Sequence, residues 1–245
     1  MSNAHDVVRL LCKEKPNLHG DTGSHQWGLA PKVLEWIATH ARHGTATIET
    51  GCGYSTLVFA AAGCQHTVIS PSPREHQRIR DWGQQHGVDL SHVTFIMDRS
   101  ETVLPTLETP PLSIALIDGW HGFPGPYLDW FFMSRLMAVG GYVLVDDVHI
   151  RACEILRDFL QTERGRWESC GQIYRTAIFK KCTDALFPGD WNTQPFNASP
   201  RYSLGQRVYR SVCSPVIRVA KGIPGVSQVL EKIRPAVHDR WGNDA

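Results

Sequence analysis

The chain has 245 residues, of which 42% are hydrophobic and 20% are charged, and its formal net charge is +1 with the histidines counted as neutral. This composition supplies enough apolar side chains for a sizeable core and excludes global disorder. A charge so close to zero gives no reason to expect a nucleic-acid partner.

The apolar periodicity along the chain predicts strands that alternate with helices. After a stretch of weak signals over residues 1–30, the strands are expected over residues 45–50, 67–69, 93–97, 112–117 and 142–145. The intervening helices are expected over residues 31–41, 55–62, 101–107, 127–138 and 150–160. Because the central strands are almost entirely apolar, we predict an α/β fold with a doubly wound, mostly parallel sheet covered on both faces. Segments near 167–170 and 173–180 indicate a terminal antiparallel strand pair.

Two local signals mark helix boundaries. Ser72, Pro73 and Glu75 have the spacing of an N-cap, a proline at the first helical position and a capping-box glutamate, so a helix is expected to begin there. Gly140-Gly141 is expected to end the helix over 127–138.

The chain is expected to divide into an N-terminal segment (1–30), a catalytic-type domain (31–182) and a proline-containing extension (183–245). Between residues 201 and 240 the extension carries eight arginines or lysines against two acidic residues. We interpret it as a solvated or partner-packed extension, with contact to an acidic membrane surface or a phosphorylated substrate as the alternative.

The seven cysteines are scattered and form no Cys-x-x-Cys pair, which predicts neither a disulfide framework nor a zinc knuckle. We see no basic start followed by an apolar run and no apolar stretch long enough to span a bilayer. A cytoplasmic location is therefore expected.

The segment from Glu49 to Thr56 reads ETGCGYST and lies between a predicted strand and a predicted helix. Glycines there let the backbone approach a ligand closely, and the helix N-terminus offers free N–H groups. A dinucleotide fingerprint needs glycine or alanine where the chain has Thr56, which argues against a nicotinamide dehydrogenase. A glutamate before the glycines suits a ligand with an ammonium group. The alternative is a strand-to-helix turn without a ligand.

Three aspartates follow two further strands. Asp118 ends the strand over 112–117, and Asp146 and Asp147 end the strand over 142–145. Carboxylates that meet at one sheet edge repel each other, and a divalent cation such as Mg²⁺ would offset that repulsion. The alternative is that one aspartate caps a helix while another contacts a cofactor. His121 and His149 follow the same strand ends and are candidate bases.

Together these motifs resemble the class I S-adenosylmethionine (SAM) methyltransferases over residues 28–182. Within that group they are similar to the metal-dependent O-methyltransferases of the catechol type and to the enzymes that methylate sugars. The resemblance implies a Rossmann-like, seven-stranded sheet, SAM as cofactor and Mg²⁺ as metal.

Residue by residue, the resemblance implies the following roles. Glu49 would hold the amino group of the cofactor, Gly51 and Gly53 would line it, Ser55 would face its carboxylate, and Ser100 would lie near the adenine. Asp118, Asp146 and Asp147 match the metal ligands, and Asp118 also counts among the cofactor contacts. His121 matches the position of the catalytic base, with His149 as a second base or an outer partner of the metal.

One position departs from that pattern. An acidic residue usually ends the second strand and binds the ribose hydroxyls, whereas this chain has Ser70. Asp98 on the next strand is the candidate to compensate, while the capping-box spacing explains Glu75. A weakened ribose contact and a degraded cofactor pocket are the two interpretations.

The expected activity is metal-assisted O-methylation of a hydroxyl, with a saccharide as first acceptor and a small phenol as second. The alternatives are a metal-independent methyltransferase acting on nitrogen or carboxylate, and a catalytically retired fold that serves as a binding module. A homo-oligomer is left open, because the sequence does not determine the oligomeric state.

Overall fold

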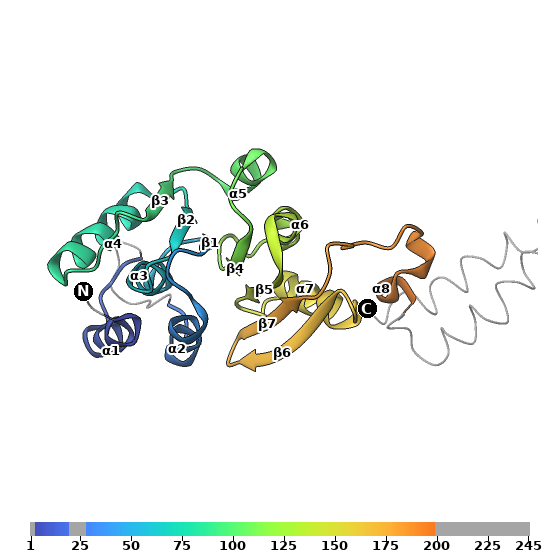
Figure 1. Ribbon diagram of the computed structural model, residues 1–245, viewed down its shortest axis with the longest axis horizontal. Helices are drawn as coiled ribbons and strands as arrows, with labels where there is room; N and C mark the ends of the chain where they lie inside the picture. The colour runs from blue at the N-terminus through green and yellow to red at the C-terminus, as the bar shows by residue number, and fades with distance from the viewer. Residues whose placement is uncertain (1–2, 20–27, 199–245) are drawn as a thin grey trace, which may run out of the picture. The chain divides into compact units, whose positions relative to one another are not determined.

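The computed structural model describes residues 3–19 and 28–198 (Figure 1). Most of the predicted basic extension, including all of its basic residues between 201 and 240, lies outside the described residues. None of the helices in the described ranges is long and apolar enough to span a membrane.

The described part of the chain contains a seven-stranded sheet in the order β3-β2-β1-β4-β5-β7-β6. The pairs from β3 to β5 are parallel, and β7 runs antiparallel to both of its neighbours. The strands are β1 (Ala46–Thr50), β2 (Gln65–Ile69), β3 (Val93–Ile96), β4 (Leu112–Ile117), β5 (Met137–Val145), β6 (Trp167–Ile173) and β7 (Thr176–Lys181). The predicted doubly wound, mostly parallel sheet with a terminal antiparallel pair is confirmed.

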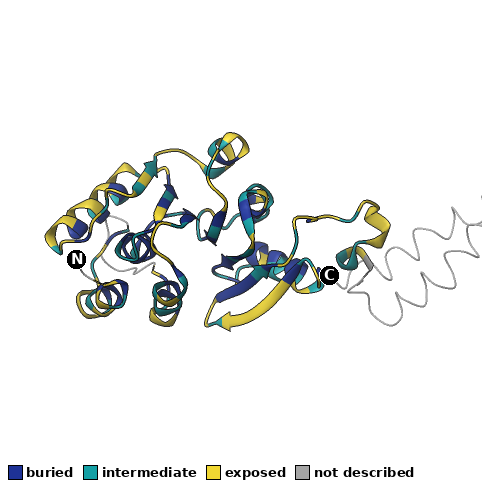
Figure 2. Ribbon diagram, viewed as in Figure 1, coloured by how far each residue is buried: buried dark blue, intermediate teal, exposed yellow. Residues whose placement is uncertain are grey.

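Helices cover both faces of the sheet (Figure 1). The α-helices are α1 (Ala4–Glu14), α2 (Pro31–His40), α3 (Tyr54–Ala61), α4 (Pro73–Gln85), α5 (Ser100–Val103), α6 (Gly125–Leu136), α7 (Arg151–Thr162) and α8 (Pro195–Ala198), and the 3₁₀ turns are η1 (Leu104–Thr106) and η2 (Trp191–Thr193). Side chains of β4 alternate between the two faces: Ile114 and Leu116 pack with the helices α1 to α4, whereas Ala115 and Ile117 pack with α6 and α7. The central strands are therefore buried on both sides, while β6 is an exposed edge strand (Figure 2).

The order in which strands are added to the sheet reverses beside β1. From β1 the chain builds outward to β2 and β3, and it then returns to place β4 on the other side of β1. In open α/β sheets the carboxyl ends of the strands at such a switch point form the ligand-binding crevice. The fold therefore brings the segments after β1, β2, β4 and β5 to one edge.

An N-terminal helix lies within residues 1–30, where the sequence pattern is weak. α1 starts after Asn3, whose side chain accepts a hydrogen bond from the backbone N–H of His5 at 3.1 Å. Val7, Val8 and Leu11 are buried on one side of α1, which packs on α2 and α3. The Asn3 cap and the spacing of the buried apolar residues are local features that account for this helix.

The strand β5 begins earlier than expected. The sequence predicts a helix to residue 138 and a glycine stop at 140–141, but residues 137–141 belong to β5, where Met137 pairs with Leu112. A Cβ at Gly141 would lie 2.9 Å from the carbonyl oxygen of Leu112, so this glycine permits a close strand contact. The diglycine thus marks an irregular strand.

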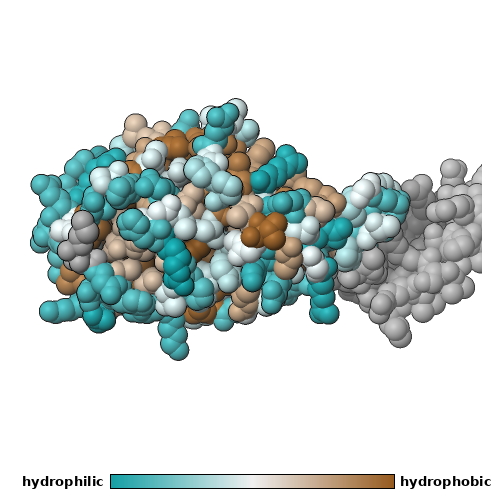
Figure 3. Space-filling model, in the orientation of Figure 1, coloured by the Kyte–Doolittle hydropathy of each residue, from teal (hydrophilic) through white to brown (hydrophobic). Residues whose placement is uncertain are grey.

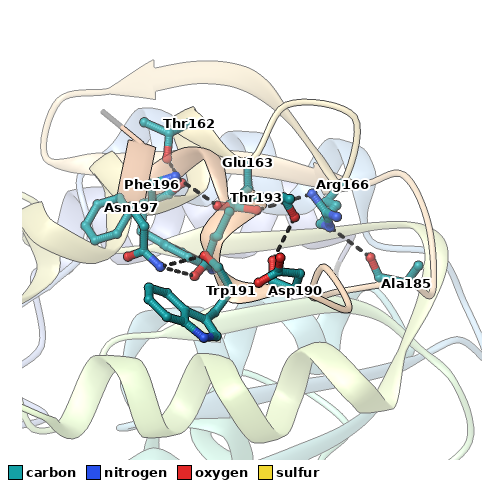
Figure 4. A network of polar contacts seen from close by, with 11 residues as sticks. Thr162, Glu163, Arg166, Ala185, Asp190, Trp191, Thr193, Phe196 and Asn197 are labelled. Carbon is teal, nitrogen blue, oxygen red and sulfur yellow. Dashed lines mark hydrogen bonds and ion pairs between the residues drawn. The ribbon is translucent and has the colours of Figure 1, made fainter. Parts of the chain in front are cut away.

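The first part of the predicted extension packs on α7. Glu163 at the end of α7 is fully buried, and its carboxylate accepts a hydrogen bond from the backbone N–H of Phe196 at 3.3 Å and pairs with Arg166 at 3.4 Å (Figure 4). Arg166 also donates to the carbonyl of Ala185 at 3.1 Å. These bonds attach residues 185–196 to the sheet domain.

The face drawn in Figure 3 carries mostly hydrophilic and intermediate side chains, with hydrophobic ones scattered between them. Scattered exposed apolar residues are normal for a folded domain. This face of the domain therefore shows no continuous apolar patch.

Candidate active site

A cleft of about 1290 Å³ opens at the carboxyl edge of the sheet. Its walls come from the segments after β1, β2, β4 and β5, as the reversal of the strand order beside β1 predicts. The predicted site residues among its lining are Gly51, Ser70, Ser100, Asp118, Asp146, Asp147, His121 and His149. These eight predicted residues therefore lie along one cleft.

The glycine bend after β1 is pressed against the end of β4. Gly51 has φ +85°, and a Cβ at that position would lie 2.3 Å from the carbonyl oxygen of Asp118. At Gly53 a Cβ would lie 2.9 Å from Nε2 of His19. Gly51 lines the cleft, whereas Gly53 faces His19 and is not among the described lining residues. The two glycines thus serve different neighbours.

Glu49 and Ser55 lie beneath the bend. The Glu49 side chain is 1% exposed, and its carboxylate accepts hydrogen bonds from the hydroxyls of Ser55 and Thr56 and from His66 Nε2, the last at 3.2 Å. Neither Glu49 nor Ser55 is among the described lining residues of the cleft. In this arrangement both residues hold the bend and the start of α3 in place, and their contact with a cofactor stays a prediction.

Three carboxylates and two imidazoles gather at the ends of β4 and β5. Nε2 of His121 lies 3.6 Å from a carboxylate oxygen of Asp118 and 3.8 Å from one of Asp147. Nδ1 of His149 lies 3.4 Å from the other oxygen of Asp147. Asp146 accepts a hydrogen bond from the hydroxyl of Thr176 on β7. The predicted convergence of the two strand ends is therefore observed.

This crowding shifts the proton affinities of the group. Burial and the neighbouring charges of Asp146 and Glu49 raise the pKa of Asp118 to about 7, although the nearby imidazole of His121 acts in the opposite direction. Burial lowers the pKa of His121, but the carboxylates around it outweigh burial, so the net shift is upward. The proton affinities of Asp118 and His121 are therefore both raised, and the two side chains lie side by side at the end of β4.

The same cluster does not fit a divalent metal as it is arranged. Among the described residues, no group of three or more His, Cys, Asp or Glu side chains is placed to hold a metal ion. The His121 ring lies between Asp118 and Asp147, and Asp146 is engaged by Thr176. The predicted ligand set Asp118, Asp146 and Asp147 is thus close in space, but its geometry does not support the metal.

The residues predicted to lie near the ribose and the adenine of the cofactor differ in whether they line the cleft. Ser70 is buried and lines the cleft, and Ser100 lines it at the start of α5. Asp98 is exposed, is not among the described lining residues, and accepts a hydrogen bond from the N–H of Arg99 at 2.7 Å. Asp98 therefore lies poorly for the compensating role that the sequence suggested.

Sequence reasoning missed several cleft residues. His19, Cys52, Arg99 and Arg175 line the cleft, as does Glu75, which the sequence had explained as a helix cap. His19 comes from the segment of weak signals, and Arg175 comes from the turn between β6 and β7. Only Glu75 carried a usable signal, because it is the acidic residue nearest to the end of β2.

Asp129 of α6 is a further buried acid behind the cleft. It is 2% exposed, and its Oδ1 has no hydrogen-bond partner among the described residues. Burial raises the pKa of Asp129, while the nearby hydroxyls of Ser100 and Thr50 lower it less, so the net shift is upward. The neighbouring Trp130 is 3% exposed and packs in the core.

One family model matches the central part of this chain. Residues 48–148 match a family model described as "Methyltransferase domain". This range runs from β1 through the glycine bend to the residues after β5. No curated protein matches the chain.

Solved structures share the fold. SAH-bound PaMTH1, a methyltransferase from Podospora anserina, has a TM-score of 0.54 at 16% identity over 75% of this chain and 89% of its own. The O-methyltransferase TomG from Streptomyces achromogenes, in complex with SAM, has a TM-score of 0.53 at 17% identity, with 75% and 91% covered. Cofactor-bound Rv0187 from MTB has a TM-score of 0.53 at 19% identity, with 74% and 98% covered. These neighbours share the fold of this chain, and the family match covers the part of it from β1 to the residues after β5.

Proposed function

We propose that the cleft binds SAM and that His121 removes the proton from an acceptor hydroxyl during methyl transfer to oxygen. The observation that carries this proposal is the position of His121 between Asp118 and Asp147, beside the glycine bend at Gly51. A base of this kind is needed because a neutral hydroxyl is a weak nucleophile, whereas a methyl group on a sulfonium is already electrophilic.

Bound SAM would supply an activated methyl group, which leaves its sulfur with the bonding electrons remaining on that sulfur. The acceptor oxygen forms the new bond to carbon, and its proton passes to Nε2 of His121. Asp118 and Asp147 stabilise the imidazolium that results, because both carboxylates lie within 4 Å of that nitrogen. The remaining contribution of the protein is to align the acceptor oxygen with the methyl carbon.

His149 is a positioning residue in this scheme. Its Nδ1 is 3.4 Å from Asp147, whose other oxygen faces His121. Asp147 has φ +50°, a conformation that aspartate tolerates better than most residues. The imidazole of His149 therefore orients a carboxylate that in turn orients the base.

Metal assistance by Mg²⁺, which the resemblance implied, stays a prediction without support from the side-chain geometry. The proton transfer above needs no metal and uses only groups whose positions are described. Metal removal separates the two schemes, because transfer through His121 alone survives EDTA.

The acceptor is proposed to be a saccharide hydroxyl or a small phenol. Trp120 lines the cleft and is 65% exposed. A Cβ at Gly122 would lie 2.3 Å from its ring, and one at Gly125 would lie 3.0 Å from it, so the following loop packs tightly against the indole. A rigidly held aromatic face in a cleft is suited to stacking on a sugar or aromatic ring.

The test is an acceptor screen with methyl-labelled SAM over saccharides, phenols, amines and carboxylates, run with added Mg²⁺ and with EDTA. Label in a hydroxyl product, retained in EDTA and lost in His121→Ala, supports the proposal. Label only in amines or carboxylates would replace it with the corresponding transferase. No binding of SAH by calorimetry would indicate a retired fold.

A further inference from the structure

Glu75 places a carboxylate in the cleft where the second strand ends. It lies in the first turn of α4 and lines the cleft together with Ser70. One carboxylate oxygen accepts a hydrogen bond from Nδ1 of His19 at 3.3 Å, and the other accepts one from the thiol of Cys52 at 3.5 Å. The Glu75 side chain is 23% exposed, so each oxygen keeps room for a second donor from a ligand.

The helix does not use this carboxylate. The predicted N-cap is present, since Ser72 Oγ accepts from the backbone N–H of Glu75 at 3.4 Å. The reciprocal half of the capping box is absent within the described residues: the backbone N–H of Ser72 donates to Ser70 Oγ at 3.4 Å, and Glu75 points toward the glycine bend. The capping-box explanation of Glu75 is therefore wrong for its side chain.

The surroundings keep Glu75 ionised. Burial raises the pKa of Glu75. The hydrogen bond and charge of His19, the thiol of Cys52 and the charge of His76 lower it by more than burial raises it, so the net shift is downward. An ionised carboxylate only accepts hydrogen bonds. It suits a ligand group with two neighbouring O–H donors, and it repels a phosphate.

We propose that Glu75 accepts the two ribose hydroxyls of the cofactor, in place of the acidic residue that Ser70 replaces, and that His19 positions its carboxylate. This assignment rests on the proposed function, because it takes the cleft as a SAM site. It identifies a vicinal diol as the ligand group at this end of the cleft. Asp98, the other candidate, is exposed and lies outside the described lining.

His19 links the N-terminal segment to this end of the cleft. A Cβ at Gly53 would lie 2.9 Å from Nε2 of His19. Nδ1 of His19 forms the hydrogen bond to the Glu75 carboxylate. The glycine at position 53 thus leaves room for the His19 ring, which sets the direction of the carboxylate. His19 is a positioning residue and need not touch the ligand.

The test is calorimetric titration of the full-length protein with S-adenosylhomocysteine and with its 2′,3′-dideoxy analogue. Glu75→Gln should weaken the binding of S-adenosylhomocysteine about 10- to 100-fold, the range for hydrogen bonds to a charged group. It should leave the analogue within about twofold of wild type, because the analogue lacks the donors. His19→Ala should reduce the preference for the ribose form over the analogue, a ratio that a general loss of structure would not change selectively.

Two controls make the result decisive. Glu108→Gln removes an exposed charge outside the described lining and should bind like wild type. If Glu75→Gln binds S-adenosylhomocysteine as wild type does, or if Asp98→Asn loses the affinity instead, the assignment is overturned while the proposed function stands. If wild type itself binds neither compound, both are overturned. Thermal unfolding of each variant verifies that it is folded.

Discussion

Replacing Gly51 with alanine tests how closely the bend after β1 is fitted to the end of β4. At Gly51 the backbone has φ +85°, and the new Cβ would lie 2.3 Å from the carbonyl oxygen and 3.0 Å from the carbonyl carbon of Asp118. Gly44 is a matched control: its φ is +75°, and a Cβ there would meet no atom of the described residues within 4 Å. The pair separates backbone strain from the clash.

The magnitudes follow from these contacts. A left-handed conformation costs a residue with a Cβ about 1–2 kcal/mol, and both variants incur that cost. Only Gly51→Ala must also displace backbone atoms of Asp118, and forcing extra atoms into a packed site costs about 1–3 kcal/mol more. Gly51→Ala should therefore lose about 2–5 kcal/mol of unfolding free energy and Gly44→Ala about 1–2 kcal/mol.

Urea denaturation at neutral pH measures the difference, and calorimetry with S-adenosylhomocysteine measures the effect on the cleft. Because Asp118 is the residue displaced, Gly51→Ala should also weaken binding, whereas Gly44→Ala should not. Equal losses of stability in the two variants would show that Asp118 does not restrict position 51, and the described contact between the bend and β4 would be wrong.

Three further variants test the rest of the site and the fold. His121→Ala should lower turnover by about 10²-fold or more with little change in the affinity for S-adenosylhomocysteine, and an unchanged rate would exclude it as the base. Since the folded-state pKa of Asp118 is raised to about 7, the unfolded chain ionises first, and the unfolding free energy should fall as the pH rises toward 7. Asp118→Asn should flatten that part of the pH profile, and a profile identical to wild type would contradict the raised pKa. Glu163→Ala leaves Arg166 and the Phe196 N–H without their carboxylate, so it should cost about 1–3 kcal/mol and speed amide exchange at Phe196; protection at wild-type levels would show that Glu163 does not hold this segment.

Local patterns predicted the elements that depend on neighbours in the sequence. β4 was predicted at its observed bounds because six residues of nearly continuous burial leave a plain apolar run. The start of α4 was equally clear, because Ser72 and Pro73 act on the backbone within one turn. β5 was misplaced because residues 137–141 are strand only through pairing with β4, a contact between segments about 25 residues apart.

Side-chain direction was the part that local patterns could not supply. Glu49 was expected in the cleft, but it turns inward to His66, 17 residues away. Glu75 was expected to cap a helix, but it turns to the cleft and meets His19, 56 residues away. Each carboxylate has a histidine partner that only the folded chain brings near.

The sequence by itself determined the alternation of strands and helices, the glycine bend and the set of acidic and imidazole groups that follow β4 and β5. These features depend on backbone conformation, burial period and chain order, which are written within a few residues. Only the tertiary structure decided which carboxylates face the cleft and that His121 lies between Asp118 and Asp147. The direction of a charged side chain depends on the donors and charges around it, and here those come from distant segments.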